Sequence, residues 1–190
     1  YGVSITPTIT PLDRNRVDVL LVIAEGKPAK IRDINIVGNQ TFQDVDIRQG
    51  WESGTTNWLS WYRRDDQYSR EKISGDLEKL SNFYLDRGYV DFNVESTQIA
   101  ISPSKQDMFV TANVSEGVKY KVSSVTVSGD TVLPQAQIEN MILIRKDNYF
   151  SRALLELSTN SITTVLGNIG YAFAEVTPIP EVNRDDHTVS

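Results

Sequence analysis

The sequence predicts an α+β fold built from tandem repeats, each with the order β-α-α-β-β. Each repeat is expected to form a three-stranded mixed sheet covered by two helices. Three repeated patterns predict this fold: an extended segment that ends in a Gly-Asx turn, a long amphipathic helix that ends in Gly-Tyr, and a pair of extended segments that closes on Glu-Gly. Internal repetition of this kind predicts an array of similar units along the chain.

The first strand of a repeat is predicted twice, by "IRDINIVGNQTF" (31–42) and by "VSSVTVSGDTVL" (122–133). In both segments, apolar residues alternate at a spacing of two, which is typical of a strand with one buried face. The Gly-Asx turn that follows contains Gly38 in one copy and Gly129 in the other. A short first helix is predicted after each turn.

The second helix is predicted by "YSREKISGDLEKLSNFYLDRGY" (68–89) and "FSRALLELSTNSITTVLGNIGY" (150–171). Their apolar residues follow the spacing of one helical face. Each pattern stops at a glycine, where a left-handed backbone conformation is accessible without steric cost. A tyrosine that is expected to fold back on the last helical turn comes next, so the residues predicted to end the two helices are Gly88, Tyr89, Gly170 and Tyr171.

Two extended stretches joined by a polar turn follow each helix and predict a β-hairpin. The chain begins with such a hairpin, "YGVSITPTIT" to "RVDVLLVIAEG". We therefore expect residues 1–27 to be the C-terminal part of one repeat and residues 28–117 to be a complete repeat. Residues 118–190 are expected to form a repeat that lacks the end of its last strand.

The composition excludes several classes of function. The net charge is −6 with a pI near 4.8, and no basic run is present, so we expect no nucleic-acid partner. The chain has no Cys and one His, His187, which leaves no set of ligands with metal-like spacing. No catalytic motif is supported by its partner motifs. The sequence therefore predicts a non-enzymatic protein without a cofactor or metal.

These motifs resemble POTRA (polypeptide-transport-associated) domains. The Gly-Asx turn, the "DLEKLSNFYLDRGY" helix, the hairpin and the closing Glu-Gly carry the resemblance, which extends over the whole chain. The middle segment is most similar to the third POTRA domain of an outer-membrane β-barrel assembly protein. The first segment is similar to the end of the second domain, and the last segment to most of the fourth.

The resemblance implies a periplasmic scaffold of the Gram-negative outer-membrane protein assembly machinery. Its implied partners are unfolded outer-membrane proteins and accessory assembly lipoproteins. Membrane contact would come only through a β-barrel downstream of this chain. The POTRA region of a translocation-assembly protein or of a two-partner secretion transporter is an alternative within the family. A periplasmic glycan-binding module is an alternative from another class.

The second strand of the middle repeat is the candidate binding site. In a three-stranded sheet of this order it lies at an edge, where backbone groups can pair with a foreign strand. It contains no Pro, whereas Pro7 and the pair Pro178 and Pro180 interrupt the corresponding strands of the other two repeats. We expect this edge either to accept another strand or to face solvent only. The predicted binding residues are Asn93, Val94, Glu95, Ser96, Thr97, Gln98, Ile99, Ala100 and Ile101.

An aromatic-rich insert, "WESGTTNWLSWYRRDD" (51–66), separates the two helices of the middle repeat. Aromatic residues together with Arg are typical of interface anchors, so Trp58, Trp61 and Arg63 form a possible partner patch. The alternative is that these aromatic side chains fold over the helix pair and extend a thin core. Trp58 and Trp61 are also the only candidates for stacking against a glycan.

Overall fold

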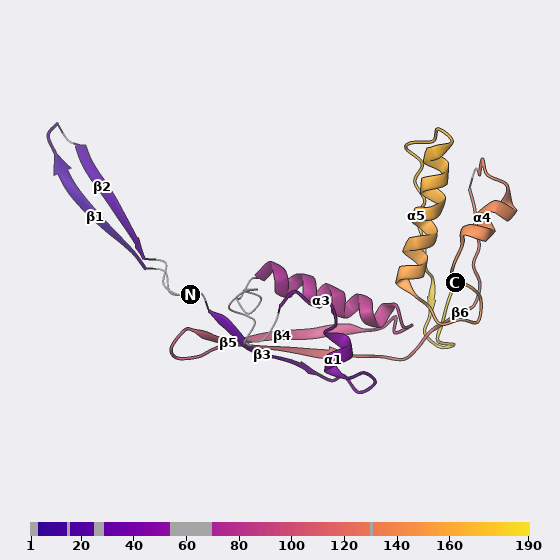
Figure 1. Cartoon of the computed structure of the whole chain (residues 1–190), viewed down its shortest axis with the longest axis horizontal. Helices are drawn as coiled ribbons and strands as arrows, with labels where there is room; N and C mark the ends of the chain where they lie inside the picture. The colour runs from indigo at the N-terminus through magenta and orange to yellow at the C-terminus, as the bar shows by residue number, and fades with distance from the viewer. Residues whose placement is uncertain (1–3, 15, 25–28, 54–69, 130) are drawn as a thin grey trace. The chain divides into compact units, whose positions relative to one another are not determined.

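The computed structural model describes residues 4–14, 16–24, 29–53, 70–129 and 131–190 (Figure 1). Its strands and helices follow one another in the predicted order, and the three sheets have two, three and three strands. The α+β class with three-stranded mixed sheets, predicted from the sequence, is confirmed.

The first hairpin consists of β1 (Ser4–Leu12) and β2 (Arg16–Ala24), which lie side by side in Figure 1. The two strands pair antiparallel along their whole length, with Pro7 opposite Leu21. Every described residue of both strands is exposed.

The middle repeat supplies a sheet whose order is β3-β5-β4. Its central strand buries every second residue, namely Met108, Val110, Ala112 and Val114, as one core face requires. Along the helix that follows the insert, Ile73, Leu80 and Tyr84 are buried, which confirms the predicted apolar face. The elements of this repeat are β3 (Lys30–Val37), α1 (Asp44–Ile47), α3 (Arg70–Leu85), β4 (Asn93–Ile101) and β5 (Asp107–Ser115).

The last repeat has the same order of strands in its sheet, β6-β8-β7. Strand β8 pairs parallel with β6 and antiparallel with β7, so the sheet is mixed. Helices α4 and α5 pack together around Leu133, Ile138 and Ile162. The elements are β6 (Lys121–Val122), α4 (Gln135–Met141), α5 (Arg152–Asn168), β7 (Val182–Asn183) and β8 (Thr188–Val189).

The first strand of the last repeat is shorter than its sequence pattern suggests. Only Lys121 and Val122 are in a strand, and Val125 is 43% exposed. Strand β8 offers two pairing positions, Thr188 and Val189, and β6 is a strand only where β8 lies beside it. Alternating apolar residues therefore become a strand here only where a partner is present.

Both long helices end in the same hydrogen-bond motif. Tyr89 N–H donates to Tyr84 O at 3.1 Å and Gly88 N–H to Leu85 O at 3.4 Å, while Tyr171 N–H donates to Leu166 O at 2.9 Å and Gly170 N–H to Gly167 O at 3.1 Å. This pair of bonds is the Schellman motif, which needs a left-handed residue after the helix. The φ angles are 93° at Gly88 and 105° at Gly170, as the helix-stop pattern predicts.

Candidate protein-binding edge strand

Strand β4 is an outer strand of its sheet, because β5 separates it from β3. An outer strand turns alternate backbone N–H and C=O groups away from its sheet, where a further strand can pair with them. Its nine residues, at roughly 3.3 Å each, give about 30 Å of extended backbone. The predicted edge position of the second strand is thereby confirmed.

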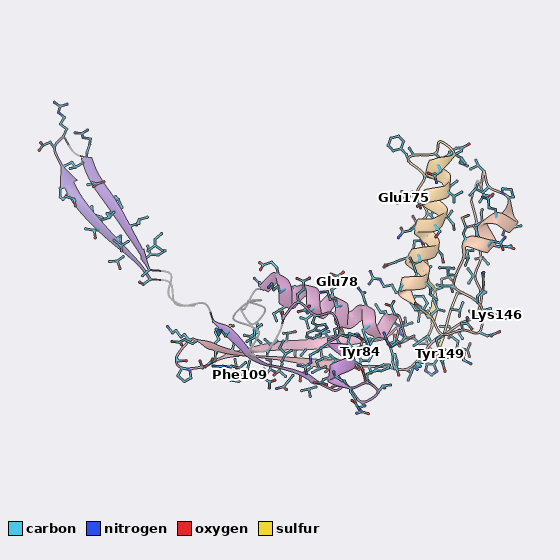
Figure 2. The ribbon with its side chains drawn as sticks, viewed as in Figure 1. Glu78, Tyr84, Phe109, Lys146, Tyr149 and Glu175 are labelled. Carbon is cyan, nitrogen blue, oxygen red and sulfur yellow. The ribbon has the colours of Figure 1, made fainter. Side chains whose placement is uncertain are left out.

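The side chains of β4 are open to solvent. Eight of its nine residues are exposed, and Val94 is half-buried. Ile99 is 40% and Ile101 is 36% exposed, so the end of the strand next to the hairpin turn presents aliphatic surface. Phe109, on the neighbouring strand β5, is 42% exposed (Figure 2). A foreign strand would therefore meet both a backbone edge and aliphatic side chains.

The start of β4 is fixed by aromatic packing against α3. The ring of Phe92, the residue before β4, stacks on Tyr84 with 4.2 Å between centroids and 10° between planes. Tyr84 lies near the C-terminal end of α3 and is fully buried (Figure 2). Phe42 and Tyr89 pack edge-on against the same ring at 5.5 and 5.6 Å. This cluster anchors one end of the candidate strand.

Glu116, from the closing Glu-Gly, joins this cluster to the turn after β3. Its carboxylate accepts hydrogen bonds from the backbone N–H groups of Gln40 and Thr41, from the Thr41 hydroxyl and from the Tyr84 hydroxyl. Partial burial raises the pKa of Glu116, but the bonds from Thr41, Tyr84 and Gln40 outweigh it and lower the pKa overall. Burial, followed by the bond to Glu116, raises the pKa of Tyr84, whose hydroxyl therefore stays a donor.

Outer strands of the other two sheets differ in their prolines. Strand β1 carries Pro7, β7 follows Pro178 and Pro180, and β2, the other outer strand of the first sheet, contains no Pro. Sequence reasoning missed that β3, which is also free of Pro, forms the opposite edge of the same sheet. Its Ile31, Ile34 and Ile36 are buried, so it exposes less aliphatic side-chain surface than β4.

The other residues predicted from the sequence are not part of β4. Gly38 and Gly129 have φ angles of 102° and 117°. A Cβ at Gly38 would collide with the Val114 carbonyl, whereas one at Gly129 would meet nothing within 4 Å. Tyr89 is 6% exposed and Tyr171 is 50% exposed. The possible partner patch of Trp58, Trp61 and Arg63 lies outside the described residues.

A buried carboxylate that sequence reasoning missed is Asp76 on α3, which is 1% exposed. Its two oxygens accept the backbone N–H groups of Glu52 and Ser53, each at 2.8 Å. The only sequence signal was an acidic residue beside the apolar face of a helix. Buried carboxylates are retained where they are hydrogen-bonded, so Asp76 fixes the start of the insert on α3.

Within the described residues, no group of three or more His, Cys, Asp or Glu side chains is placed to hold a metal ion. None of the described helices has both the length and the apolarity that a membrane crossing requires.

The similarity to known proteins extends over both of the longer repeats. The family model POTRA, described as a surface antigen variable number repeat, matches residues 29–117 and 120–190. The chain is 32% identical over 189 residues to the outer membrane protein assembly factor BamA of Neisseria meningitidis serogroup B, covering 99% of the chain and 24% of that relative. It is also 32% identical over 178 residues to BamA of Buchnera aphidicola, covering 93% and 28%. The chain thus spans about a quarter of the length of these relatives.

Solved structures share the fold. A crystal structure of Haemophilus influenzae BamA POTRA3-5 superposes with a TM-score of 0.69 at 21% identity, covering 86% of this chain and 64% of that one. BamA from Haemophilus ducreyi lacking POTRA domains 1-3 gives a TM-score of 0.63 at 15% identity, covering 84% and 28%. The two family matches together extend over most of the chain and coincide with its strand-helix-helix-strand-strand units. The chain therefore belongs to the POTRA family, as tandem repeats similar to those of BamA outer membrane protein assembly factors.

Proposed function

We propose that this chain is a periplasmic scaffold of the Gram-negative outer-membrane protein assembly machinery. It binds extended segments of unfolded outer-membrane proteins, accessory assembly lipoproteins, or both, by adding their strands to β4. The names of the BamA relatives support a role in outer-membrane protein assembly. The match of the POTRA family model to two successive segments supports a scaffold built from repeats. The repeats are 28–117 and 118–190, preceded by the end of another in 1–27.

The single observation that carries the binding mode is the long outer strand β4. It combines an edge position, nine residues without Pro and exposed side chains. Main-chain hydrogen bonds provide affinity in β-augmentation and do not depend on the partner's side chains. A backbone edge therefore suits a scaffold whose clients differ in sequence but share extended segments.

Site-specific cross-linking tests the proposal. A photo-reactive residue is placed at Glu95, Thr97 or Ile99 in the full chain, which is then mixed with a urea-diluted outer-membrane protein or with accessory lipoprotein. Matched control positions are the exposed Asp33 on the opposite edge β3 and the exposed Glu175 before the proline-interrupted segment. We expect cross-links from β4 well above those from both controls.

Equal yields from Glu175 would mean that backbone availability does not select the site. A dominant yield from Asp33 would move the site to β3. Either result would overturn binding at β4, and a lack of cross-links from every position would overturn direct client binding.

A further inference from the structure

The end of α3 belongs to the same compact unit as the whole last repeat. Residues 38–49, 77–95 and 113–190 cluster together by their contacts. Residues 86–91, here called the exit segment, follow α3 and belong to the middle repeat. Val90 of this segment packs against the core of the last repeat, which consists of Tyr120, Val122, Ile144, Phe150 and Val189.

Asp86 of the exit segment caps a helix of the last repeat. Its Oδ1 accepts the backbone N–H of Ala153, in the first turn of α5, at 2.7 Å. The side-chain hydroxyl of Ser151, the N-cap residue of α5, accepts the N–H of Leu154 at 3.3 Å. Helix α5 has no acidic residue in its own first turn. The negative charge that favours a helix N-terminus is therefore supplied by the preceding repeat.

The same carboxylate is unfavourable for its own helix. Asp86 directly follows α3, and a helix C-terminus carries a partial negative charge. Removing the charge of Asp86 should therefore leave α3 unchanged or stabilise it slightly. The favourable interaction of Asp86 is therefore the one with α5. Its removal should destabilise α5 and not α3, and this difference separates the two interactions.

Asp91 satisfies the buried hydroxyl of Tyr120. Tyr120 is 1% exposed within the core of the last repeat, and its hydroxyl donates to Asp91 Oδ2. Arg184 Nε lies 3.3 Å from Asp91 Oδ1, but the Arg184 side chain is 73% exposed, so this ion pair contributes little. A buried hydroxyl that loses its partner is costly. The core of the last repeat thus depends on an acceptor from the middle repeat.

Gly88 lets the backbone of the exit segment approach the backbone of Tyr120. Its carbonyl accepts the Tyr120 N–H at 2.8 Å. A Cβ at Gly88 would lie 3.2 Å from Tyr120 O and 3.3 Å from the Cβ of Tyr149. Gly170 occupies the equivalent position in the last repeat with nothing within 4 Å. The two glycines share the helix-stop role, and only Gly88 also has a docking role.

We infer that the exit segment is an internal docking surface that couples the stability of the last repeat to the middle repeat. The carboxylates of Asp86 and Asp91 carry the coupling: one caps α5 and the other pairs with Tyr120. The middle repeat thereby supports the fold of its neighbour.

Amide hydrogen exchange on the full chain tests the coupling residue by residue. Asp86→Ala should speed exchange in the first two turns of α5 by about fivefold, as loss of a cap does. Asp91→Ala, which removes the acceptor of the Tyr120 hydroxyl, should speed exchange at Tyr120 and Val122. In both variants, exchange along β5 should match the wild type. The charge control is Glu78→Gln, at an exposed position on α3, which should leave exchange in α5 unchanged (Figure 2).

A matched pair of glycine substitutions gives a second, independent test of the coupling. Gly88→Ala and Gly170→Ala impose the same left-handed strain, but only Gly88→Ala should speed exchange at Tyr120 and Phe150. Unchanged exchange in the last repeat of the Asp86 and Asp91 variants would overturn the inference. So would an equal acceleration along β5, because that would report a general loss of stability.

Discussion

Glu116 connects three segments that are distant in the sequence. Its carboxylate accepts bonds from the turn at Gln40 and Thr41, which follows β3, and from Tyr84 on α3. The closing Glu-Gly was recognisable in the sequence as the end of a repeat. Its role in holding the turn and the helix together depends on the folded arrangement, because more than seventy residues separate Glu116 from Thr41.

Glu116→Gln should lower the free energy of unfolding at pH 7 by on the order of 1–2 kcal/mol, because charge-assisted bonds to three donor residues are weakened. The folded-state pKa of Glu116 is lowered from 4.5, so its contribution is present above that pH and is lost as the pH falls through the folded-state value. Urea titrations of both proteins should show a constant difference at pH 6–8 that shrinks below about pH 4.5. A difference that grows in acid would contradict this assignment.

At the scale of elements, the middle sheet has two outer strands, β3 and β4, and both are free of Pro. Strand β5 is central and buries Ala112 to 1% exposure. A proline should therefore be tolerated where the N–H of β4 points away from the sheet, and should not be tolerated at Ala112 of β5.

Proline scanning checks this contrast. Consecutive residues on an edge strand point their N–H groups alternately toward and away from the sheet. Of Thr97→Pro and Gln98→Pro, one should keep the fold and weaken client binding, and the other should lower stability. Ala112→Pro should cost about 3 kcal/mol or more and unfold the middle repeat. Circular dichroism and thermal melting measure the fold, and cross-linking from Glu95 measures binding.

Full stability of Ala112→Pro would contradict the central position of β5. Undiminished cross-linking in both edge variants would show that the backbone of β4 does not bind the client.

At the scale of the whole molecule, the chain carries a net charge of −6 and no basic run. Attraction between opposite charges is therefore a weak basis for binding clients of varied charge. β-Augmentation instead relies on main-chain hydrogen bonds and on aliphatic contacts such as those that Ile99 and Ile101 offer.

Client binding should accordingly change little with salt. Raising NaCl from 50 to 500 mM shortens the screening length severalfold, which weakens contacts between exposed charges. We expect the affinity of the full chain for an extended outer-membrane protein peptide to change less than about threefold, measured by fluorescence anisotropy. A steep loss of affinity with salt would indicate that charged side chains dominate instead.

The sequence by itself determined the order of elements, the repeats and the two helix stops, because these depend on residues that are neighbours along the chain. The spacing of Ile73, Leu80 and Tyr84 predicts a helix face, and Gly88 and Gly170 predict its end. A Schellman motif closes within six residues, so a local pattern is sufficient to specify it.

Only the tertiary structure decided which residues meet across repeats. Asp86 and Ala153 are 67 positions apart, and no local pattern pairs a carboxylate after one helix with the first turn of another. The same holds for Asp76 with the start of the insert and for β3 as a second edge. Each of these contacts depends on which segment lies alongside. The partner segment is set by the packing of apolar faces that are distant in the sequence. Loop-closure entropy and burial, rather than local propensity, therefore decide the pairing.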